Sequence, residues 1–104
     1  MLDNSFKLLI SDDAELDILD AFLWYEDQKS ELGNSFLKDV ELSLIAIQKQ
    51  PQYYHIVKLN TRAYVMKRFP FSIIYHLVEN TINVLAVFHT SRNPIDWQNR
   101  NIDL

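Results

Sequence analysis

Hydrophobic positions along the chain change their spacing near residue 50, and this change separates a helical half from a strand-like half. A short apolar run at residues 6–10 predicts a first strand. Two later stretches repeat apolar side chains every three or four residues, which is the spacing of one helix face. The first stretch contains Leu16, Leu19, Phe22 and Leu23, and the second contains Phe36, Val40, Leu44 and Ile47.

Polar residues and one proline mark the ends of the two predicted helices. Asp12 and Glu15 stand three residues apart before the first apolar stretch, a capping-box arrangement that starts a helix. Residues 28–31 are polar and separate the helices. Pro51 ends the second helix because its ring cannot occupy a helix interior. The short connection, next to the only glycine, Gly33, predicts an antiparallel helical hairpin.

The first predicted helix has a wide apolar side. Ile18, Trp24 and Tyr25 stand beside its main apolar stripe rather than on it. Since apolar side chains are stabilised by removal from water, we expect this helix to be covered on more than one side.

The second half of the chain is strand-like. Three runs rich in β-branched and aromatic residues occupy 63–69, 71–78 and 81–89, separated by Pro70 and by Glu79-Asn80. Runs this continuously apolar predict central strands covered on both faces. The order is a strand, a helical hairpin and a three-stranded antiparallel meander, which predicts an α+β fold with the helices packed on one sheet. Without any linker or repeat, we expect one domain over residues 1–104, ending in a polar tail at 91–104.

Charge is distributed unevenly between the two halves. The net charge of −4 argues against a nucleic-acid partner. Residues 1–41 hold 11 acidic and 3 basic residues, a net −8, whereas residues 42–104 hold 3 acidic and 7 basic residues, a net +4. This asymmetry indicates either an acidic face and a basic face, or a helical half that is simply solvated by acidic side chains and a strand half solvated by basic ones.

The composition excludes several kinds of chemistry. The absence of cysteine excludes disulfides, thiol nucleophiles and zinc–thiolate sites, and it fits a reducing compartment. One glycine is too few for a phosphate-binding loop, and no serine has a nucleophile-elbow context. Strand pairing could bring His76 and His89 together, but further metal ligands are missing. We therefore expect neither a metal nor a cofactor.

The N-terminal residues and the hydropathy pattern bear on location. Residues 1–7 contain no apolar run of the kind found in a secretory signal. No stretch of the chain approaches the roughly 18 apolar residues of a membrane-spanning helix. We expect a cytoplasmic protein without membrane association.

Several short segments, in order, resemble one family over about residues 6–100. In the helical half these are Tyr25-Glu26, Leu32-Gly33, Phe36 and Val40; in the strand half they are Pro51-Gln52-Tyr53-Tyr54, Arg62, residues 67–75, residues 82–89, Ser91-Arg92-Asn93-Pro94, Trp97 and Arg100. Together they resemble the RelE/ParE superfamily, in its ParE-like or plasmid-stabilisation branch. The resemblance implies a growth-inhibiting toxin of a type II toxin–antitoxin system that is held inactive by a cognate antitoxin.

The resemblance leaves the cellular target open, because its branches share a fold. The ParE branch poisons DNA gyrase by binding, whereas the RelE branch cleaves messenger RNA on the ribosome. By our alignment, Ser72 and Thr90 stand where the ribonuclease branch carries arginines. Both departures remove charge that RNA cleavage would use to stabilise the phosphate. We therefore favour a ParE-like toxin without catalysis of its own over a RelE-like ribonuclease or an inert member that only binds antitoxin.

The candidate site residues follow from these alternatives. If the chain is a ribonuclease, its catalytic candidates are a proton carrier, His89, and four cations, Arg62, Lys67, Arg68 and Arg92. For target binding we favour the polar tail, with Arg92, Trp97 and Arg100, because loops carry function more often than cores. For antitoxin binding we favour Arg62, Lys67 and Arg68, which we expect to meet acidic antitoxin residues.

Overall fold

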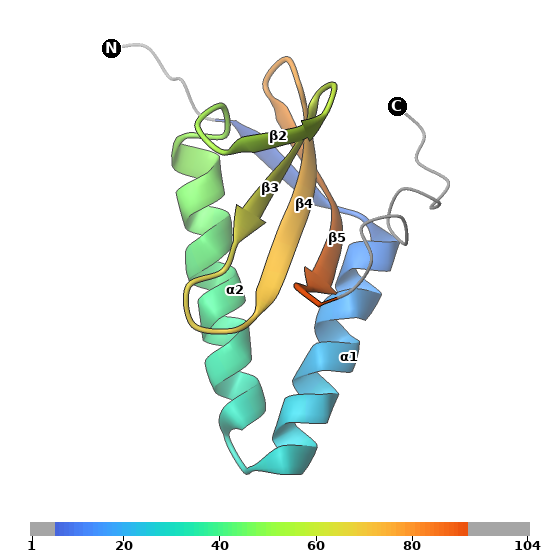
Figure 1. Ribbon diagram of the computed structural model, residues 1–104, viewed down its shortest axis with the longest axis vertical. Helices are drawn as coiled ribbons and strands as arrows, with labels where there is room; N and C mark the ends of the chain where they lie inside the picture. The colour runs from blue at the N-terminus through green and yellow to red at the C-terminus, as the bar shows by residue number, and fades with distance from the viewer. Residues whose placement is uncertain (1–5, 92–104) are drawn as a thin grey trace.

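The computed structural model describes residues 6–91, which form two helices and five strands (Figure 1). In chain order the elements are β1 (Lys7–Ile10), α1 (Asp12–Gln28), α2 (Leu32–Lys49), β2 (His55–Lys58), β3 (Thr61–Val65), β4 (Phe71–Val78) and β5 (Thr81–His89). The predicted first strand, helical hairpin and C-terminal meander are all present. The predicted boundaries of β4 and β5 match those of the structure.

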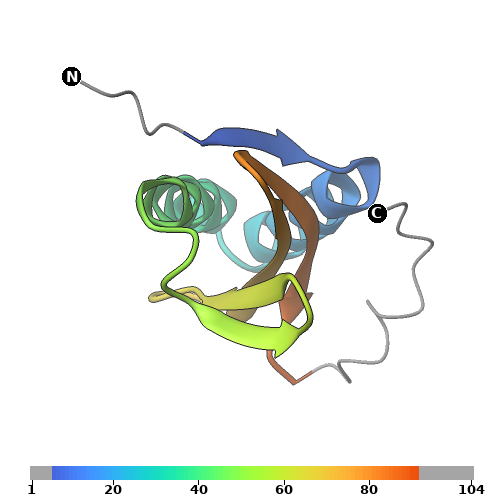
Figure 2. The same ribbon diagram turned by 90° about the horizontal axis from the view of Figure 1, so that it is seen from above.

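The five strands form one mixed sheet with the order β1-β5-β4-β3-β2. The meander is antiparallel as predicted, and β4 and β5 are central strands. Strand β2 was not predicted, and β3 ends at Val65 rather than Phe69. The first strand pairs with β5 in parallel, which the separation of helices from strands did not suggest. Seen from above, the sheet is strongly curved, and α2 lies on its concave side (Figure 2).

Helix α1 starts one residue earlier than its predicted capping box. Its N-cap is Ser11, whose Oγ accepts a hydrogen bond from the backbone N–H of Ala14 at 3.1 Å. Asp12, Asp13 and Glu15 occupy the first turn instead, where negative charge is favoured by the positive end of the helix dipole. The capping role assigned to Asp12 was therefore wrong, although the helix start was correct to within one residue.

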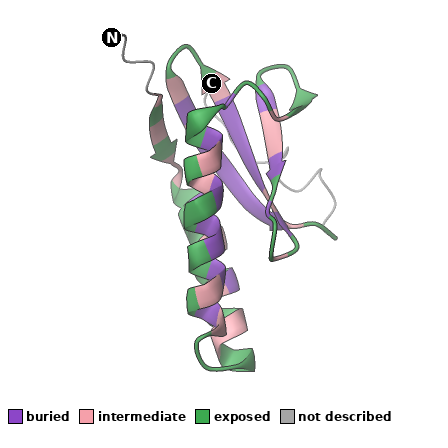
Figure 3. Ribbon diagram, turned by 90° about the vertical axis from the view of Figure 1, so that its left-hand side faces the viewer, coloured by how far each residue is buried: buried purple, intermediate pink, exposed green. Residues whose placement is uncertain are grey.

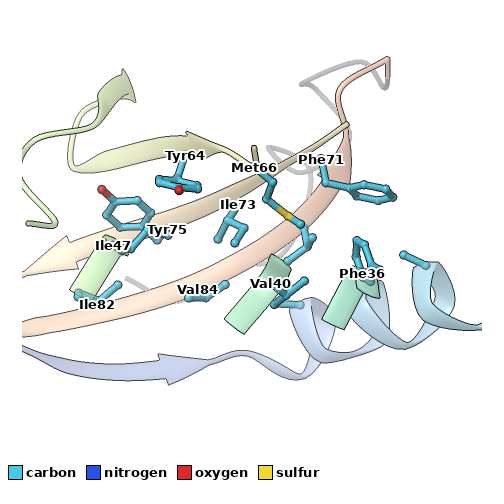
Figure 4. Packing of buried hydrophobic residues seen from close by; sticks show 13 residues of the cluster. Phe36, Val40, Ile47, Tyr64, Met66, Phe71, Ile73, Tyr75, Ile82 and Val84 are labelled. Atoms are coloured by element: carbon cyan, nitrogen blue, oxygen red, sulfur yellow. The ribbon is translucent and has the colours of Figure 1, made fainter. Parts of the chain in front are cut away.

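The main core lies between α2 and the concave side of the sheet (Figure 4). Helix α2 contributes Phe36, Val40 and Ile47 at the predicted spacing, and all three are buried. Alternation along β4 directs Phe71, Ile73 and Tyr75 to this side. Buried and exposed residues alternate around α2, as expected for a helix with one face on a sheet (Figure 3).

A second, smaller cluster lies on the opposite side of the two central strands. Its buried members are Ile74, Leu85, Ala86 and Phe88, with Ala63 of β3 packed against them. A bulge in β5 leaves Leu85 as the extra residue between Val84 and Ala86, and both Leu85 and Ala86 join Ile74 in this cluster. The prediction that the central strands are buried on both faces is thus confirmed.

The two helices approach each other closely at Gly33. A Cβ atom at this position would lie 2.8 Å from both the ring and the carbonyl oxygen of Phe22. The carboxylate of Glu26 in α1 accepts hydrogen bonds from the backbone N–H groups of Glu31 and Gly33, each at 3.0 Å. A carboxylate at the N-terminal end of α2 satisfies otherwise unpaired donors, so Glu26 fixes the hairpin turn.

The tip of the hairpin projects beyond the ends of the strands (Figure 1). Four large apolar residues of α1 are exposed, and they are distributed along the helix rather than confined to the tip. These are Leu16, Leu19, Leu23 and Trp24. The expectation that α1 is covered on more than one side was wrong, because its buried and half-buried residues follow one side of the helix and the opposite side is exposed. No helix within residues 6–91 is long and apolar enough to span a membrane.

Candidate functional site

A groove of about 480 Å³ opens where α1 passes the ends of β4 and β5. Helix α1 contributes Asp17, Asp20, Trp24 and Tyr25 to its wall, and the sheet contributes Phe71 and His89. The groove therefore combines carboxylates, aromatic rings and one imidazole. It is within the range of pocket sizes that bind small ligands.

The side of the groove formed by α1 is held to the sheet by a carboxylate. The short β1 pairs only with the first residues of β5, up to Val84. Beyond that point the start of α1 bonds to β5 in place of β1. The backbone N–H of Val87 donates to Oδ2 of Asp17 at 2.9 Å, and the hydroxyl of the N-cap Ser11 donates to the carbonyl of Leu85 at 3.3 Å. A buried strand donor that would otherwise be unpaired is thus satisfied by Asp17.

His89 is the last residue of β5 and lies opposite Phe71. The centroids of the two rings are 5.3 Å apart in an edge-to-face arrangement. Nδ1 of His89 accepts a hydrogen bond from the backbone N–H of Ser91 at 3.1 Å, so the proton of the neutral ring is on Nε2. His89 is thus a positioned, half-buried imidazole at the edge of the groove.

Arg62 has a structural role that the sequence did not indicate. It lies in β3 opposite Tyr75, and its Nη1 donates to the carbonyls of Gln52 and Tyr54 at 2.9 and 2.8 Å. These bonds hold the loop between α2 and β2 against the sheet. The guanidinium is therefore already engaged within the chain.

Lys67 and Arg68 lie at the other end of β3, in the exposed loop that leads to β4. The buried carboxylate of Asp39 in α2 fixes this loop, because its Oδ2 accepts from the backbone N–H groups of Arg68 and Phe69 at 3.0 and 3.1 Å. The backbone N–H of Thr90 also donates to the carbonyl of Pro70 at 2.8 Å. The loop and His89 thus share one end of the sheet, whereas Arg62 is remote from both.

Ser72 and Thr90, the two positions at which we expected a departure from the ribonuclease branch, also lie at this end. Ser72 pairs with Phe88 and Val65, on the side of the sheet away from the helices. Thr90 is exposed directly after β5. Neither side chain brings a charge to His89. Arg92, Trp97 and Arg100, the predicted target-binding residues, lie outside the described residues.

The histidines do not form a metal site. His76 lies opposite Asn83, on the side of the sheet away from the helices, whereas His89 faces the helices near the far end of the strands. Within residues 6–91 there is no group of three histidine, cysteine or carboxylate side chains that could hold a metal ion. The pairing of His76 with His89 considered from the sequence does not occur.

Two tyrosines, the half-buried Tyr25 and the buried Tyr75, stabilise the surroundings of the site. Burial raises the pKa of Tyr25, which lines the groove and packs against Phe69 with 4.9 Å between ring centroids. Burial also raises the pKa of Tyr75 to about 12. The Tyr75 hydroxyl donates to the carbonyl of Pro51 at 2.6 Å. Both hydroxyls are therefore protonated at neutral pH.

Three features of the site escaped the sequence analysis: the long-range bonds of Asp17, those of Asp39, and the groove beside Trp24. In the sequence, both aspartates look like solvated acids of an amphipathic helix. Their bonds join residues 70 and about 30 positions apart, so no local spacing could reveal them.

The architecture and the sequence agree on a family. The family model of the ParE toxin of the parDE type II toxin–antitoxin system matches residues 8–94. The chain belongs to the ParE toxin family. It is thus a toxin of the type II class, whose partner is a cognate antitoxin, as expected from the sequence.

Solved structures of this kind share the fold at low sequence identity. A chain of the chromosomal ParDE toxin–antitoxin system from P. aeruginosa is similar with a TM-score of 0.74 and 16% identity, over 84% of this chain and 98% of that one. The isolated E. coli RelE toxin is similar with a TM-score of 0.61 and 11% identity, over 90% and 94%. These matches confirm the RelE/ParE-like fold. No curated protein sequence matches the chain.

Proposed function

We propose that the chain is a single toxin domain that arrests growth in the bacterial cytoplasm by binding DNA gyrase, without catalysis of its own. A cognate antitoxin neutralises it in a toxin–antitoxin hetero-oligomer. One observation carries the choice of mechanism: Ser72 and Thr90 leave the end of the sheet beside His89 without the two cations of the ribonuclease branch. Stabilising developing charge is usually the largest catalytic contribution in such a reaction, so its loss favours binding.

Two surfaces have distinct roles in this proposal. Target binding is assigned to Arg92, Trp97 and Arg100, which follow directly on the end of β5 in sequence. Antitoxin binding is assigned to the exposed Lys67 and Arg68, which acidic antitoxin residues would contact. Arg62 contributes to this surface indirectly, by holding the loop between α2 and β2.

A ribosome-dependent ribonuclease is the second candidate. It is favoured by the position of His89, a hydrogen-bonded imidazole on the same end of the sheet as Lys67 and Arg68. In that mechanism His89 would move the proton of the 2′-hydroxyl and the two cations would stabilise the phosphate.

Two assays on one purified preparation distinguish these mechanisms. The first incubates the protein with gyrase, ATP and supercoiled plasmid, and the second with translating ribosomes followed by primer-extension mapping of the messenger. We expect stabilised gyrase-cleaved plasmid and an intact messenger. His89→Ala should leave the gyrase effect nearly unchanged, whereas Trp97→Ala and Arg100→Ala should reduce it strongly. Codon-level cleavage that disappears in His89→Ala would establish the ribonuclease instead.

Growth assays test the toxin role itself. Induction of the chain alone should arrest bacterial growth, and co-induction of the product of the neighbouring reading frame should restore it. Normal growth with verified folded protein would identify an inert family member that has kept only antitoxin binding. Arrest without an effect in either biochemical assay would exclude both gyrase and messenger as targets.

A further inference from the structure

Helix α1 exposes an apolar stripe that the fold does not use. Leu16, Leu19 and Leu23, here called the leucine stripe, are 57%, 48% and 53% exposed. Trp24 follows at 59%. The three leucines are spaced i, i+3 and i+7, which places them along one side of the helix. This is the pattern that receives the apolar face of a second amphipathic helix.

The groove adjoins this stripe at Trp24, which lines the groove and directly follows Leu23 in the helix. Asp20 stands one turn before Trp24 and also lines the groove. Within the described part of the chain, Asp20 makes no hydrogen bond or ion pair. The groove thus offers a carboxylate and aromatic rings to one incoming side chain.

The charge of α1 selects the chemistry of that side chain. The helix carries seven acidic residues and no lysine or arginine. A nucleic acid would be repelled by this surface, since its phosphates need basic contacts. A protein segment with basic residues is attracted. Arginine fits best, because its planar guanidinium both pairs with carboxylates and stacks on aromatic rings.

The surroundings of the groove add a second charge of opposite sign. Tyr25 in the groove packs against Phe69, the residue after Arg68 in the basic loop. An acidic helix and a basic loop therefore flank one aromatic cluster. A partner segment that crosses this cluster is complementary when it is basic toward α1 and acidic toward Lys67 and Arg68.

We infer that the leucine stripe and the groove bind an amphipathic helix of the cognate antitoxin, with one arginine of that helix placed between Trp24 and Asp20. This inference rests on the proposed function, because it takes the antitoxin as the partner. The leucine stripe supplies apolar contact area, and the groove sets the register of the bound helix. A stable complex buries about 800 Å² on each partner, which requires a surface of this extent rather than the basic loop alone.

The test measures the dissociation constant of the full chain with the product of the neighbouring reading frame. Asp20→Asn removes the charge and keeps the shape of the side chain, and it should weaken binding about 10-fold or more. Trp24→Ala should weaken it to a similar degree, whereas Trp24→Phe, which keeps an aromatic ring, should weaken it less. Asp27→Asn is the matched control: it is an exposed acid on the same side of α1 but outside the groove, and it should change binding by no more than about 2-fold.

Charge reversal then identifies the bound side chain. Asp20→Lys should weaken binding more than Asp20→Asn, and changing one particular antitoxin arginine to glutamate should restore part of the loss. No such rescue should occur with Asp27→Lys. If no antitoxin arginine restores binding to Asp20→Lys, the placement of an arginine in the groove is wrong.

The remaining outcomes separate this inference from the proposed function. Failure of the two proteins to associate at all would contradict the proposed function. Association with an unchanged dissociation constant in Asp20→Asn and Trp24→Ala would overturn only the inference. If these variants lower the melting temperature of the free chain without changing the dissociation constant, the two side chains stabilise the fold rather than the complex. If they abolish self-association of the free chain without changing the dissociation constant, the groove is filled by a second copy. Either result also overturns the inference.

Discussion

The two helices of the hairpin pack on the same sheet, yet they use their residues in opposite ways. Helix α2 buries six residues, including Phe36, Asp39 and Ile47. Helix α1 buries only Ala14 and Ala21, and it exposes the leucine stripe and Trp24. The regular apolar stripe of α2 packs into the core, and only residues beside that stripe, Leu37, Leu42 and Ile45, are exposed. In α1 the regular apolar stripe itself is largely exposed to water.

This difference indicates a division between folding and recognition. Exposed leucines in a regular stripe do not stabilise the free chain, and contiguous apolar surface usually marks an interaction site. The polar contacts follow the same division. Asp39 of α2 is buried and fixes the basic loop, whereas most acids of α1 are exposed. We therefore expect changes in α2 to affect stability and changes on the stripe to affect binding.

Phe36→Ala should have the largest effect on stability. The Phe36 side chain is fully buried and lies 5.1–5.5 Å, between ring centroids, from Tyr25, Phe69 and Phe71. Its removal should lower the free energy of unfolding by about 3–5 kcal/mol, from lost apolar burial and the cavity left behind. Urea denaturation followed by circular dichroism measures this. A fall in the free energy of unfolding of less than about 1 kcal/mol would contradict the placement of Phe36 in the core.

Asp39→Ala should have the next largest effect. It leaves the backbone N–H groups of Arg68 and Phe69 without their acceptor, which should cost about 2 kcal/mol. Because the loop loses its anchor, hydrogen exchange at residues 67–70 should also accelerate. Glu41→Ala, an exposed acid on the same helix, is the control and should change stability by less than about 0.5 kcal/mol. Equal effects of the two substitutions would refute the anchoring role.

Tyr75→Phe should produce a smaller, pH-dependent effect at the end of α2. Loss of its hydrogen bond to the Pro51 carbonyl should cost about 1 kcal/mol at neutral pH. Burial raises the pKa of Tyr75 from 10.0 to about 12, so the folded state holds this proton more tightly than the unfolded state does. The stability that results is complete below pH 10 and is lost as the pH rises toward 12.

Denaturation curves from pH 9 to pH 12 test whether stability falls as the pH rises, as this raised pKa predicts. The original chain should lose stability over that range more steeply than Tyr75→Phe does. The other tyrosines titrate in both proteins, so they cancel in the comparison. Parallel pH profiles would show that the Tyr75 hydroxyl is not held in its protonated form by the fold.

Leu23→Ala should have the smallest effect on stability and a clear effect on binding. Because the side chain is half-exposed, the free energy of unfolding should fall by no more than about 0.5 kcal/mol. Antitoxin affinity should fall several-fold, since the substitution removes apolar contact area. Calorimetric titration and thermal melts of one preparation measure both quantities. A large loss of stability with unchanged affinity would place Leu23 in the core.

The sequence predicted the sheet where local patterns determine it. Strands β4 and β5 have continuous apolar runs bounded by Pro70 and by Glu79-Asn80, so their limits were correct. Strand β2 was missed because its four residues are all exposed and therefore show no burial pattern. The parallel pairing of β1 with β5 joins segments more than 70 residues apart, and no local pattern encodes it.

The site was less predictable than the fold. The apolar spacing of α1 suggested burial, because a stripe reserved for a partner has the same pattern as one packed on the core. The charge of Arg62 suggested a binding residue, but the carbonyls of Gln52 and Tyr54 engage it. Lys67 and Arg68 are exposed as expected of binding residues, and their role stays a prediction.

Hydrogen exchange of the chain, alone and bound to its antitoxin, tests the division between the helices most directly. The amides of α2 should exchange slowly in both states, because the core already protects them. The amides of residues 16–25 should gain the largest protection on binding, together with those of the loop at 67–70. Strong new protection elsewhere, with residues 16–25 unchanged, would contradict the assignment of α1 to antitoxin recognition.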